Sequence, residues 1–251
     1  MNSSRPAMSE DLKPFELYYR GPSPNPWKVA IVLEELGLPW KFVEVQADEL
    51  KKEPYLSLNP NGRVPALVDP NKSITLWESG AIIDYLIAEY DASAKLHYPR
   101  TAATLVPSYQ TRCWEHFQMS GQGPYFGQKN WFSYAHPEKL PSAIERYANE
   151  IRRVTGVLDA HLAKHGTPFL VGDRATYADL MFVPYYKSVP FVIAPEIDLA
   201  EYRTFYAWLE RLYARPAVAQ VMGEWERQMV AALATRKSQK EEAAATAGKT
   251  E

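Results

Sequence analysis

The sequence has almost no cysteine, with a single thiol, Cys113, in 251 residues. One cysteine cannot form an intramolecular disulfide or a thiolate cage for a metal, and we interpret Cys113 as a buried, inert thiol. No stretch approaches about 18 consecutive apolar residues, so the sequence predicts no membrane-spanning helix. The N-terminal residues also lack the charged and apolar regions of a secretion signal. These absences favour a cytoplasmic protein in a reducing compartment, with no bound metal and no membrane as partner.

Positive and negative residues nearly balance, because the sequence has 28 Lys and Arg and 30 Asp and Glu, which gives a formal net charge of −2. This balance gives no electrostatic reason to expect nucleic acid as a partner. A chain of this length with 46% hydrophobic residues is typical of one large or two small globular domains. The abundant residues are proline, at 20, and aromatics, with 7 Trp, 16 Tyr and 9 Phe. Proline divides a chain into short elements, and aromatic side chains can line a pocket for an apolar small molecule.

Strand and helix signals alternate over residues 14–92, which we interpret as one α/β domain. A proline-rich turn separates a β-rich run at 15–19 from an apolar pattern at helical spacing that ends at Gly37. Asn25 is predicted to cap this helix, with Pro26 at its first position. The expected order is β-α-β-α-β-β-α, and the remaining elements are strands at 40–45, 64–68 and 74–77 and helices at 48–58 and 78–90.

Strand signals stop at the connector over 91–107, and every long element after it is helical. The change predicts a second, all-α domain over 105–232. Residues 1–13 and 236–251 have no apolar period and are predicted to be flexible ends. The expected helices of the second domain lie at 108–120, 141–165, 177–188, 200–214 and 216–230.

Three short motifs narrow the family. They are Ser23-Pro24-Asn25, Asn59-Pro60-Asn61-Gly62-Arg63-Val64-Pro65-Ala66-Leu67 and Trp77-Glu78-Ser79-Gly80-Ala81-Ile82. Together they resemble the cytosolic glutathione transferase superfamily, over about residues 15–225. The similarity to the fungal branch related to the yeast nitrogen regulator, and to the bacterial Nu-type enzymes, also involves the Lys28-Val29-Ala30-Ile31-Val32-Leu33-Glu34-Glu35-Leu36 run, Glu145-Arg146-Tyr147, Val171-Gly172-Asp173 and Ala178-Asp179-Leu180. The resemblance implies a thioredoxin-like N-terminal domain, a helical C-terminal domain (the GST fold) and a homodimer.

The resemblance also implies glutathione as co-substrate, whose thiolate is the nucleophile. A free thiol with a pKa near 8.5 is only about 3% ionised at neutral pH, so the site needs donors that stabilise the anion. The Ser23 hydroxyl, the Asn25 amide and the positive end of the following helix converge where a sulfur could lie. The alternative is that Asn25 merely caps the helix and Ser23 merely stiffens the turn. The resemblance favours Asn25, with Ser23 second, over Tyr18 or Tyr19.

Two further motifs suit the backbone and the γ-glutamyl end of glutathione. The resemblance implies a cis Val64–Pro65 bond, which leaves the Val64 N–H and C=O to pair with the cysteinyl backbone. An ordinary trans proline at a sheet edge is the alternative. Ser79 at a helix start suits the γ-glutamyl carboxylate and Glu78 its ammonium group, although such a pair alone is usually just a cap.

The glycyl carboxylate of glutathione requires a cation. Lys51, Lys52 and Arg63 are candidates, and Lys51 is favoured among them. The alternative for the two lysines is a solvated helix face.

The second substrate, an apolar electrophile, is expected to contact the helical domain. Aromatic residues and glycines gather there between 113 and 126, and we predict an acceptor pocket of Trp114, Phe117, Gln122 and Tyr125. These aromatics could equally belong to the core.

The leading hypothesis is therefore a glutathione S-transferase, active in fungal detoxification or secondary-metabolite biosynthesis. Addition followed by elimination would instead make the same site a double-bond isomerase, and attack on a mixed disulfide would make it a disulfide reductase. A non-catalytic regulatory module is the third alternative.

Overall fold

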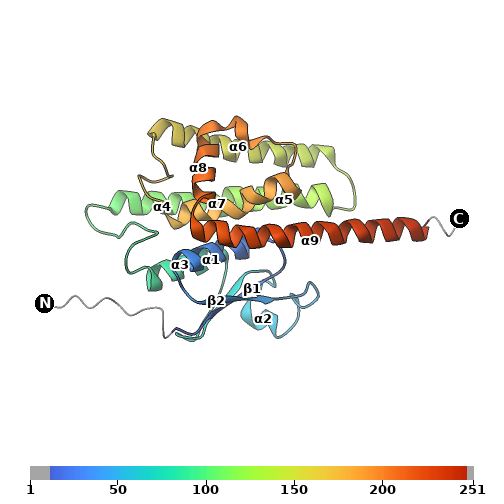
Figure 1. Cartoon of the computed structure of the whole chain (residues 1–251), viewed down its shortest axis with the longest axis horizontal. Coiled ribbons are helices and arrows are strands. Elements are labelled where there is room, and N and C mark those ends of the chain that lie inside the picture. Colours follow the sequence, from blue (N-terminus) through green and yellow to red (C-terminus); the bar gives the residue numbers. More distant parts are fainter. Residues whose placement is uncertain (1–11, 248–251) are drawn as a thin grey trace.

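The computed structural model describes residues 12–247, in which a small sheet with its helices lies against a larger set of helices (Figure 1). The N-terminal elements are β1 (Phe15–Tyr19), α1 (Pro24–Glu35), β2 (Trp40–Glu44), α2 (Tyr55–Leu58), β3 (Ala66–Asp69), β4 (Ile74–Trp77) and α3 (Ser79–Tyr90). The predicted order β-α-β-α-β-β-α and the thioredoxin-like fold class are confirmed.

The sheet has the strand order β2-β1-β3-β4, in which β1 is parallel to β2 and antiparallel to β3. A parallel pair needs a crossover connection, and α1 supplies it between β1 and β2. Tyr18, near the end of β1, lies opposite Ala66, the first residue of β3. The turn after β1 and the loop before β3 therefore meet at one edge of the sheet.

Helix α1 is buried almost all round, because it lies between the sheet and the helical domain (Figure 1). It packs against α3, α7 and α9. A helix that is apolar on every side is typical of such a buried position. Two contacts tie its ends to the helical domain: Trp225 Nε1 donates to the Pro22 carbonyl at 2.9 Å, and the Arg215 guanidinium binds Glu35 through bonds of 2.6 and 2.9 Å.

Beyond the connector, every element described is helical. These elements are α4 (Leu105–Phe117), the π-helical turn η1 (Gln118–Gln122), α5 (Gly123–Tyr134), α6 (Pro141–His165), α7 (Tyr177–Ser188), the π-helical turn η2 (Val189–Ile193), the 3₁₀ turn η3 (Leu199–Glu201), α8 (Arg203–Tyr213) and α9 (Pro216–Ala247).

Three regions differ from the sequence prediction. The helix expected at 48–58 is α-helical only over Tyr55–Leu58, after Pro54, and the residues before it form turns. The segment α5 was not predicted, because Gly123, Pro124 and Gly127 have low helix propensity. Helix α9 continues to Ala247 where residues 236–251 were predicted to be flexible, since Ala, Lys and Glu are strong helix formers even without an apolar period.

The predicted N-terminal flexible end, 1–13, lies almost wholly outside the described residues. Lys13, which is described, exchanges backbone hydrogen bonds with the Asn71 side chain at 2.9 and 3.0 Å.

Candidate functional site

A cleft of about 800 Å³ lies where the two domains meet, and most of the predicted polar site residues line it. One wall comes from the start of α1, the loop before β3 and the start of α3. The other wall comes from η1, α5 and α7. Prolines and tight loops place these segments at the domain boundary, so that side chains from distant parts of the chain face the same space.

Asn25 lies in the first turn of α1 and lines the cleft. The prediction that it caps the helix was wrong, because the helix begins at Pro24 and Ser23 is the N-cap residue. The side chain of Asn25 is thus free of a capping role, and its Oδ1 accepts a hydrogen bond from the Tyr185 hydroxyl at 3.2 Å. Ser23 makes no side-chain capping bond and is not among the residues that line the cleft.

The loop before β3 is held in shape by buried Asn59. Its Nδ2 donates to the Arg63 carbonyl at 2.6 Å, and its Oδ1 accepts from the Asn61 N–H at 2.9 Å. Gly62 has a φ of +57°, and a Cβ there would lie 2.5 Å from the Leu50 carbonyl oxygen, so the turn requires glycine. This frame places Arg63 in the wall of the cleft.

Val64 and Pro65 follow in the same loop and also line the cleft. The peptide bond between them is cis, as the family resemblance implied. Among residues 12–247, the backbone N–H of Val64 makes no hydrogen bond, which leaves it available to a ligand.

The three candidate cations for the glycyl carboxylate lie in different places in the structure. Arg63 lines the cleft, whereas the Lys51 ammonium donates to the Asn61 carbonyl at 2.6 Å, outside the set of lining residues. Lys52 pairs with Asp48 at 3.1 Å on the surface, as expected for a solvated helix face. The structure therefore puts Arg63, rather than the favoured Lys51, at the cleft.

Glu78 and Ser79 lie at the junction of β4 and α3, and both line the cleft. Glu78 has a φ of +66°, a left-handed conformation that is uncommon outside glycine and that clusters at functional sites. Ser79 is buried at the first position of α3, where the backbone N–H groups and the helix dipole favour an anion.

The helical wall is lined mainly by residues that the sequence analysis did not select. They are Met119, Gly123, Pro124, Gly127, Gln128, Trp131 and Tyr185. Apart from Met119 and Tyr185, these belong to α5, the helix that was not predicted.

Trp114 and Phe117, two of the predicted acceptor residues, do not line this cleft. The Trp114 ring packs against the His161 ring at 4.6 Å and, with Cys113, lines a separate pocket of about 230 Å³. The Phe117 ring lies 6.4 Å from that of Phe182, against the core. Cys113 itself is exposed, which corrects its interpretation as a buried thiol.

Gln122 and Tyr125, the other two, also point elsewhere. Gln122 is fully buried and donates to the Phe182 carbonyl at 3.2 Å, while the Tyr125 ring lies 6.3 Å from that of Tyr147. The prediction was based on the gathering of aromatic residues and glycines in this segment, whereas Gln122 lies within the π-helical turn η1, where its amide is buried and bonded to α7.

Lys28 is a lining residue that sequence reasoning missed. It is 1% exposed, and its Nζ donates to Gln118 Oε1 at 3.0 Å and lies 3.4 Å from the Met119 sulfur. Burial lowers the pKa of its ammonium to about 7, against the charges of Glu78 and Glu115, which raise it. A lysine in the middle of an otherwise apolar helix is the signal that could have found it.

Tyr185 is the second missed residue. It reaches the cleft from α7 in the helical domain, and burial raises its pKa to about 12. No pattern in the sequence points to it, because its contact with Asn25 joins residues 160 positions apart.

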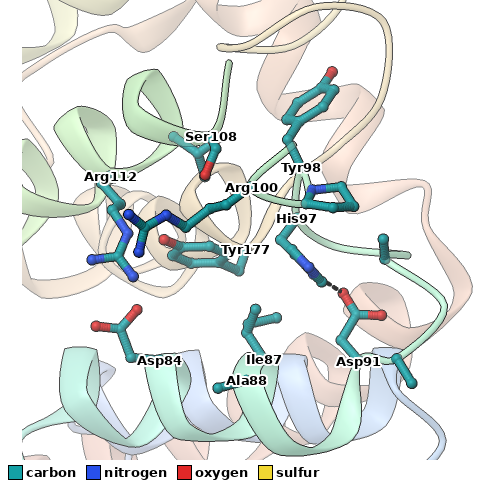
Figure 2. A pocket seen from close by; sticks show the side chains of 14 residues that line it. Asp84, Ile87, Ala88, Asp91, His97, Tyr98, Arg100, Ser108, Arg112 and Tyr177 are labelled. Atoms are coloured by element: carbon teal, nitrogen blue, oxygen red, sulfur yellow. Dashed lines mark hydrogen bonds and ion pairs between the residues drawn. The ribbon is translucent and has the colours of Figure 1, made fainter. Parts of the chain in front are cut away.

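A second pocket, of about 430 Å³, lies between α3, the connector and α4 (Figure 2). His97 Nδ1 lies 2.7 Å from Asp91 Oδ2 at one end, and Figure 2 shows Arg112 above Asp84 at the other. None of the predicted site residues lines this pocket.

Residues 12–247 offer neither a metal site nor a membrane span. Within this range, no group of three or more His, Cys, Asp or Glu is arranged to hold a metal ion. No helix there is both long enough and apolar enough to cross a membrane.

Two family models match the chain, the glutathione S-transferase N-terminal domain over residues 17–94 and the glutathione S-transferase C-terminal domain over residues 124–216. The chain is 45% identical over 222 residues to the glutathione S-transferase-like protein tpcF of Aspergillus fumigatus. The aligned region covers 85% of this chain and 97% of that protein. The chain is 36% identical over 242 residues to the protein URE2 of Debaryomyces hansenii, over 83% of this chain and 77% of the relative.

Solved structures similar to this chain are also glutathione transferases. The glutathione transferase URE2P6 of Phanerochaete chrysosporium, crystallised with oxidised glutathione, superposes with a TM-score of 0.78 at 45% identity, over 86% of this chain and 98% of that one. The chain therefore belongs to the glutathione S-transferase family. The resemblance to this superfamily and to its fungal, URE2-like branch is confirmed.

Proposed function

We propose that the protein binds glutathione along the polar wall of the cleft and activates its thiol at Asn25 for attack on an electrophilic carbon of an apolar acceptor. The observation that carries this proposal is the convergence of Asn25, Arg63, Val64, Glu78 and Ser79 on one cleft. These groups come from separate segments, yet each matches a different functional group of one tripeptide.

The match runs from end to end of the tripeptide. Glu78 pairs with the γ-glutamyl ammonium, and Ser79 with the N-terminus of α3 binds the γ-glutamyl carboxylate. The Val64 backbone pairs with the cysteinyl residue in the manner of an added strand. Arg63 is the cation for the glycyl carboxylate, and Lys51, which precedes α2, binds the Asn61 carbonyl of the loop that holds Arg63.

Asn25 then meets the sulfur. Its amide N–H donates to the thiolate, and the N-terminal end of α1 adds a positive potential. Lowering a thiol pKa by about two units corresponds to roughly 2.7 kcal/mol and raises the ionised fraction at neutral pH about 25-fold. The gain in rate is smaller, because nucleophilicity falls with pKa at a slope of about 0.4 to 0.5.

The acceptor lies against the helical wall. Met119, Pro124 and Trp131 present apolar surface there, which suits an apolar electrophile of detoxification or secondary metabolism.

The proposal is tested by retention on immobilised glutathione together with turnover of a generic chromogenic electrophile. Retention with conjugate formation is the expected result. Failure to bind glutathione would overturn every glutathione-dependent function and favour a non-catalytic regulatory role. Binding with turnover of an alkene isomer but no conjugate would favour the double-bond isomerase.

Disulfide reduction is a second candidate, because URE2P6 and URE2P8 of Phanerochaete chrysosporium were crystallised with oxidised glutathione. In that reaction a glutathione thiolate attacks the glutathionyl sulfur of a mixed disulfide, which forms oxidised glutathione and releases the acceptor thiolate. Rapid reduction of a glutathionylated model thiol, with no conjugation, would favour this function.

We propose further that the chain acts as a homodimer. The strand β4 is at the edge of the sheet and exposes Trp77, and the start of α4 exposes Leu105, Val106 and Tyr109. Exposed apolar side chains on an edge strand and at the start of a helix suit a second copy of the chain. Light scattering should give about twice the chain mass of 28.6 kDa, and a monomer mass would refute the dimer.

The compartment remains the reducing cytosol in this proposal, where the glutathione pool is kept reduced. Microscopy of a fluorescent fusion in the source organism would test it, and an organellar signal would contradict it.

A further inference from the structure

The side-chain amide of Asn25 has two chemically different ends, and only one of them can help a thiolate. The Nδ2 group donates hydrogen bonds, whereas Oδ1 only accepts them and would repel a sulfur anion. Which end faces the sulfur therefore decides whether Asn25 activates or opposes ionisation. The sequence of α1 does not settle this orientation, because an asparagine amide can rotate by half a turn with little change in shape.

With the Tyr185 hydroxyl as the donor, one contact sets the orientation in the structure. The Tyr185 hydroxyl donates to Asn25 Oδ1 at 3.2 Å, and this is the hydrogen bond that the Asn25 side chain makes within residues 12–247. The donor comes from α7 in the other domain, behind the turn that carries Asn25. With Oδ1 engaged by Tyr185, the Nδ2 group is left for a ligand in the cleft.

Tyr185 is well placed to hold this contact. It is buried, its ring packs edge-on against Phe126 at 6.0 Å, and the Lys28 ammonium lies 5.8 Å from its ring centroid. A Cβ at Gly123 would lie 3.5 Å from the hydroxyl oxygen, so α5 approaches closely on that side. The ring is thus confined by several elements, and its hydroxyl has little freedom to leave Asn25.

The hydroxyl also keeps its proton. Burial raises the pKa of Tyr185 to about 12, despite the hydrogen bond to Asn25 and the charge of Arg63, which both lower it. Across the pH range in which a thiol ionises, Tyr185 remains a neutral donor. It therefore cannot serve as the base that removes the thiol proton.

We propose that Tyr185 is a positioning residue for thiol activation, which holds the Asn25 carboxamide with its N–H group toward the glutathione sulfur. The inference rests on the proposed function, since it needs Asn25 to meet that sulfur. It assigns the helical domain a part in activating the thiol, in addition to its part in binding the acceptor.

The test is Tyr185→Phe, which removes the hydroxyl and keeps the ring. Losing one hydrogen bond that orients a catalytic group should lower kcat/KM about five- to tenfold at neutral pH. The KM for glutathione should change little, and the loss should shrink at high pH, where the thiol ionises without help. The ultraviolet absorbance of the bound thiolate should report a raised thiol pKa.

The matched control is Tyr186→Phe. Tyr186 is the next residue of α7, is also buried, and its hydroxyl lies 3.1 Å from that of Thr155, away from the cleft. This variant should keep the wild-type pH profile and thiol pKa. Thermal unfolding of both variants separates a loss of stability from a loss of positioning.

A double variant separates the inference from the proposed function. If Tyr185 acts through Asn25, adding Tyr185→Phe to Asn25→Ala should cause little further loss. No loss of activity in Asn25→Ala alone would overturn the role of Asn25 in the proposed function. Where Asn25→Ala does lose activity, three results would overturn the positioning role of Tyr185. They are a wild-type pH profile in Tyr185→Phe, fully multiplicative effects of the two substitutions, and a Tyr185→Phe loss of equal size at all pH values.

Discussion

The cleft wall that the thioredoxin-like domain contributes is polar and charged, with Asn25, Arg63, Glu78 and Ser79, whereas the helical wall presents mainly apolar groups, glycines and Trp131. A glutathione molecule carries charges at both ends and needs the first kind of surface. An apolar acceptor needs the second. Under the proposed function, the two substrates are recognised by different domains, so changes in each wall should have separable effects.

The walls meet at the buried residues Lys28 and Tyr185. Lys28 binds Gln118 of η1, and Tyr185 binds Asn25 of α1, so each bond crosses the domain boundary. The separation of roles is therefore incomplete at the base of the cleft, and the largest effects are expected there.

The largest expected effect concerns the pH dependence of stability. The pKa of Lys28 falls from 10.5 to about 7 on folding, so between these values the unfolded chain holds a proton that the folded chain lacks. The free energy of unfolding should therefore rise with pH across this window, by up to about 1.4 kcal/mol per pH unit from this group. Urea unfolding of the wild type and Lys28→Met at several pH values checks this.

The difference in unfolding free energy between the wild type and Lys28→Met isolates the contribution of the lysine from that of other titrating groups. Lys28→Met removes the amine, keeps most of the side-chain length and leaves Gln118 Oε1 without its donor, a cost of about 1–3 kcal/mol that does not depend on pH. Relative to the wild type, the variant should become less stable as pH rises from 7. Parallel stability curves for the two proteins would contradict a neutral Lys28 amine in the folded state.

The next effect tests the polar wall at the sulfur. Asn25→Ala should lower kcat/KM about 10- to 100-fold at neutral pH and less at high pH, because the loss is in thiolate stabilisation. Asn25→Asp should lose more, since it keeps the size of the side chain but places a negative charge beside the sulfur. A negative charge in the first turn of α1 is favourable to the helix, so this variant should fold. A loss of equal size at every pH would show that Asn25 only holds the turn.

The third effect tests the polar wall at the γ-glutamyl end. Glu78→Gln removes the charge that pairs with the ammonium group and should weaken glutathione binding about five- to tenfold in calorimetry, whichever acceptor is used. Glu89→Gln is the control, because Glu89 lies near the end of α3 and pairs with Lys72 on the surface. Equal affinity in the two variants would remove Glu78 from the glutathione site.

The smallest effect tests the helical wall. Trp131→Ala should raise the KM for a bulky apolar acceptor about three- to tenfold and leave the affinity for glutathione unchanged. Tyr134→Ala is matched to it, because Tyr134 lies on the same helix with 54% exposure against 49% for Trp131 but does not line the cleft. Weaker glutathione binding in Trp131→Ala would break the division between the two walls.

The sequence could predict the polar wall because its residues belong to short local motifs. Asn25 follows a proline-rich turn, Val64 and Pro65 lie directly before a strand, and Glu78 and Ser79 are at the start of a helix, so neighbours in the chain largely fix their positions. The element order of the N-terminal domain followed from the same local signals. The cap was misplaced, because the helix begins at Pro24 and not after Asn25, and the predicted Ser23 and Lys51 do not line the cleft.

The helical wall could not be predicted in the same way. Trp114, Phe117, Gln122 and Tyr125 were selected for composition and position, and the π-helical turn η1 redirected the residues near it. A π-helical turn depends on packing around Gln118 and Gln122, which are buried against α7 and leave no periodic signal. Helix α5 was missed because its glycines and proline oppose helix formation locally.

The sequence by itself determined the α/β half, the helical half, the family and the polar residues proposed to bind glutathione, because each depends on spacing within a few consecutive residues. Only the tertiary structure decided which cation faces the cleft, which aromatic residue of α5 lines it, and that Lys28 and Tyr185 line it as well. These features depend on contacts between residues as far as 160 positions apart. Such contacts are set by how the two domains pack, and local spacing carries no record of that packing.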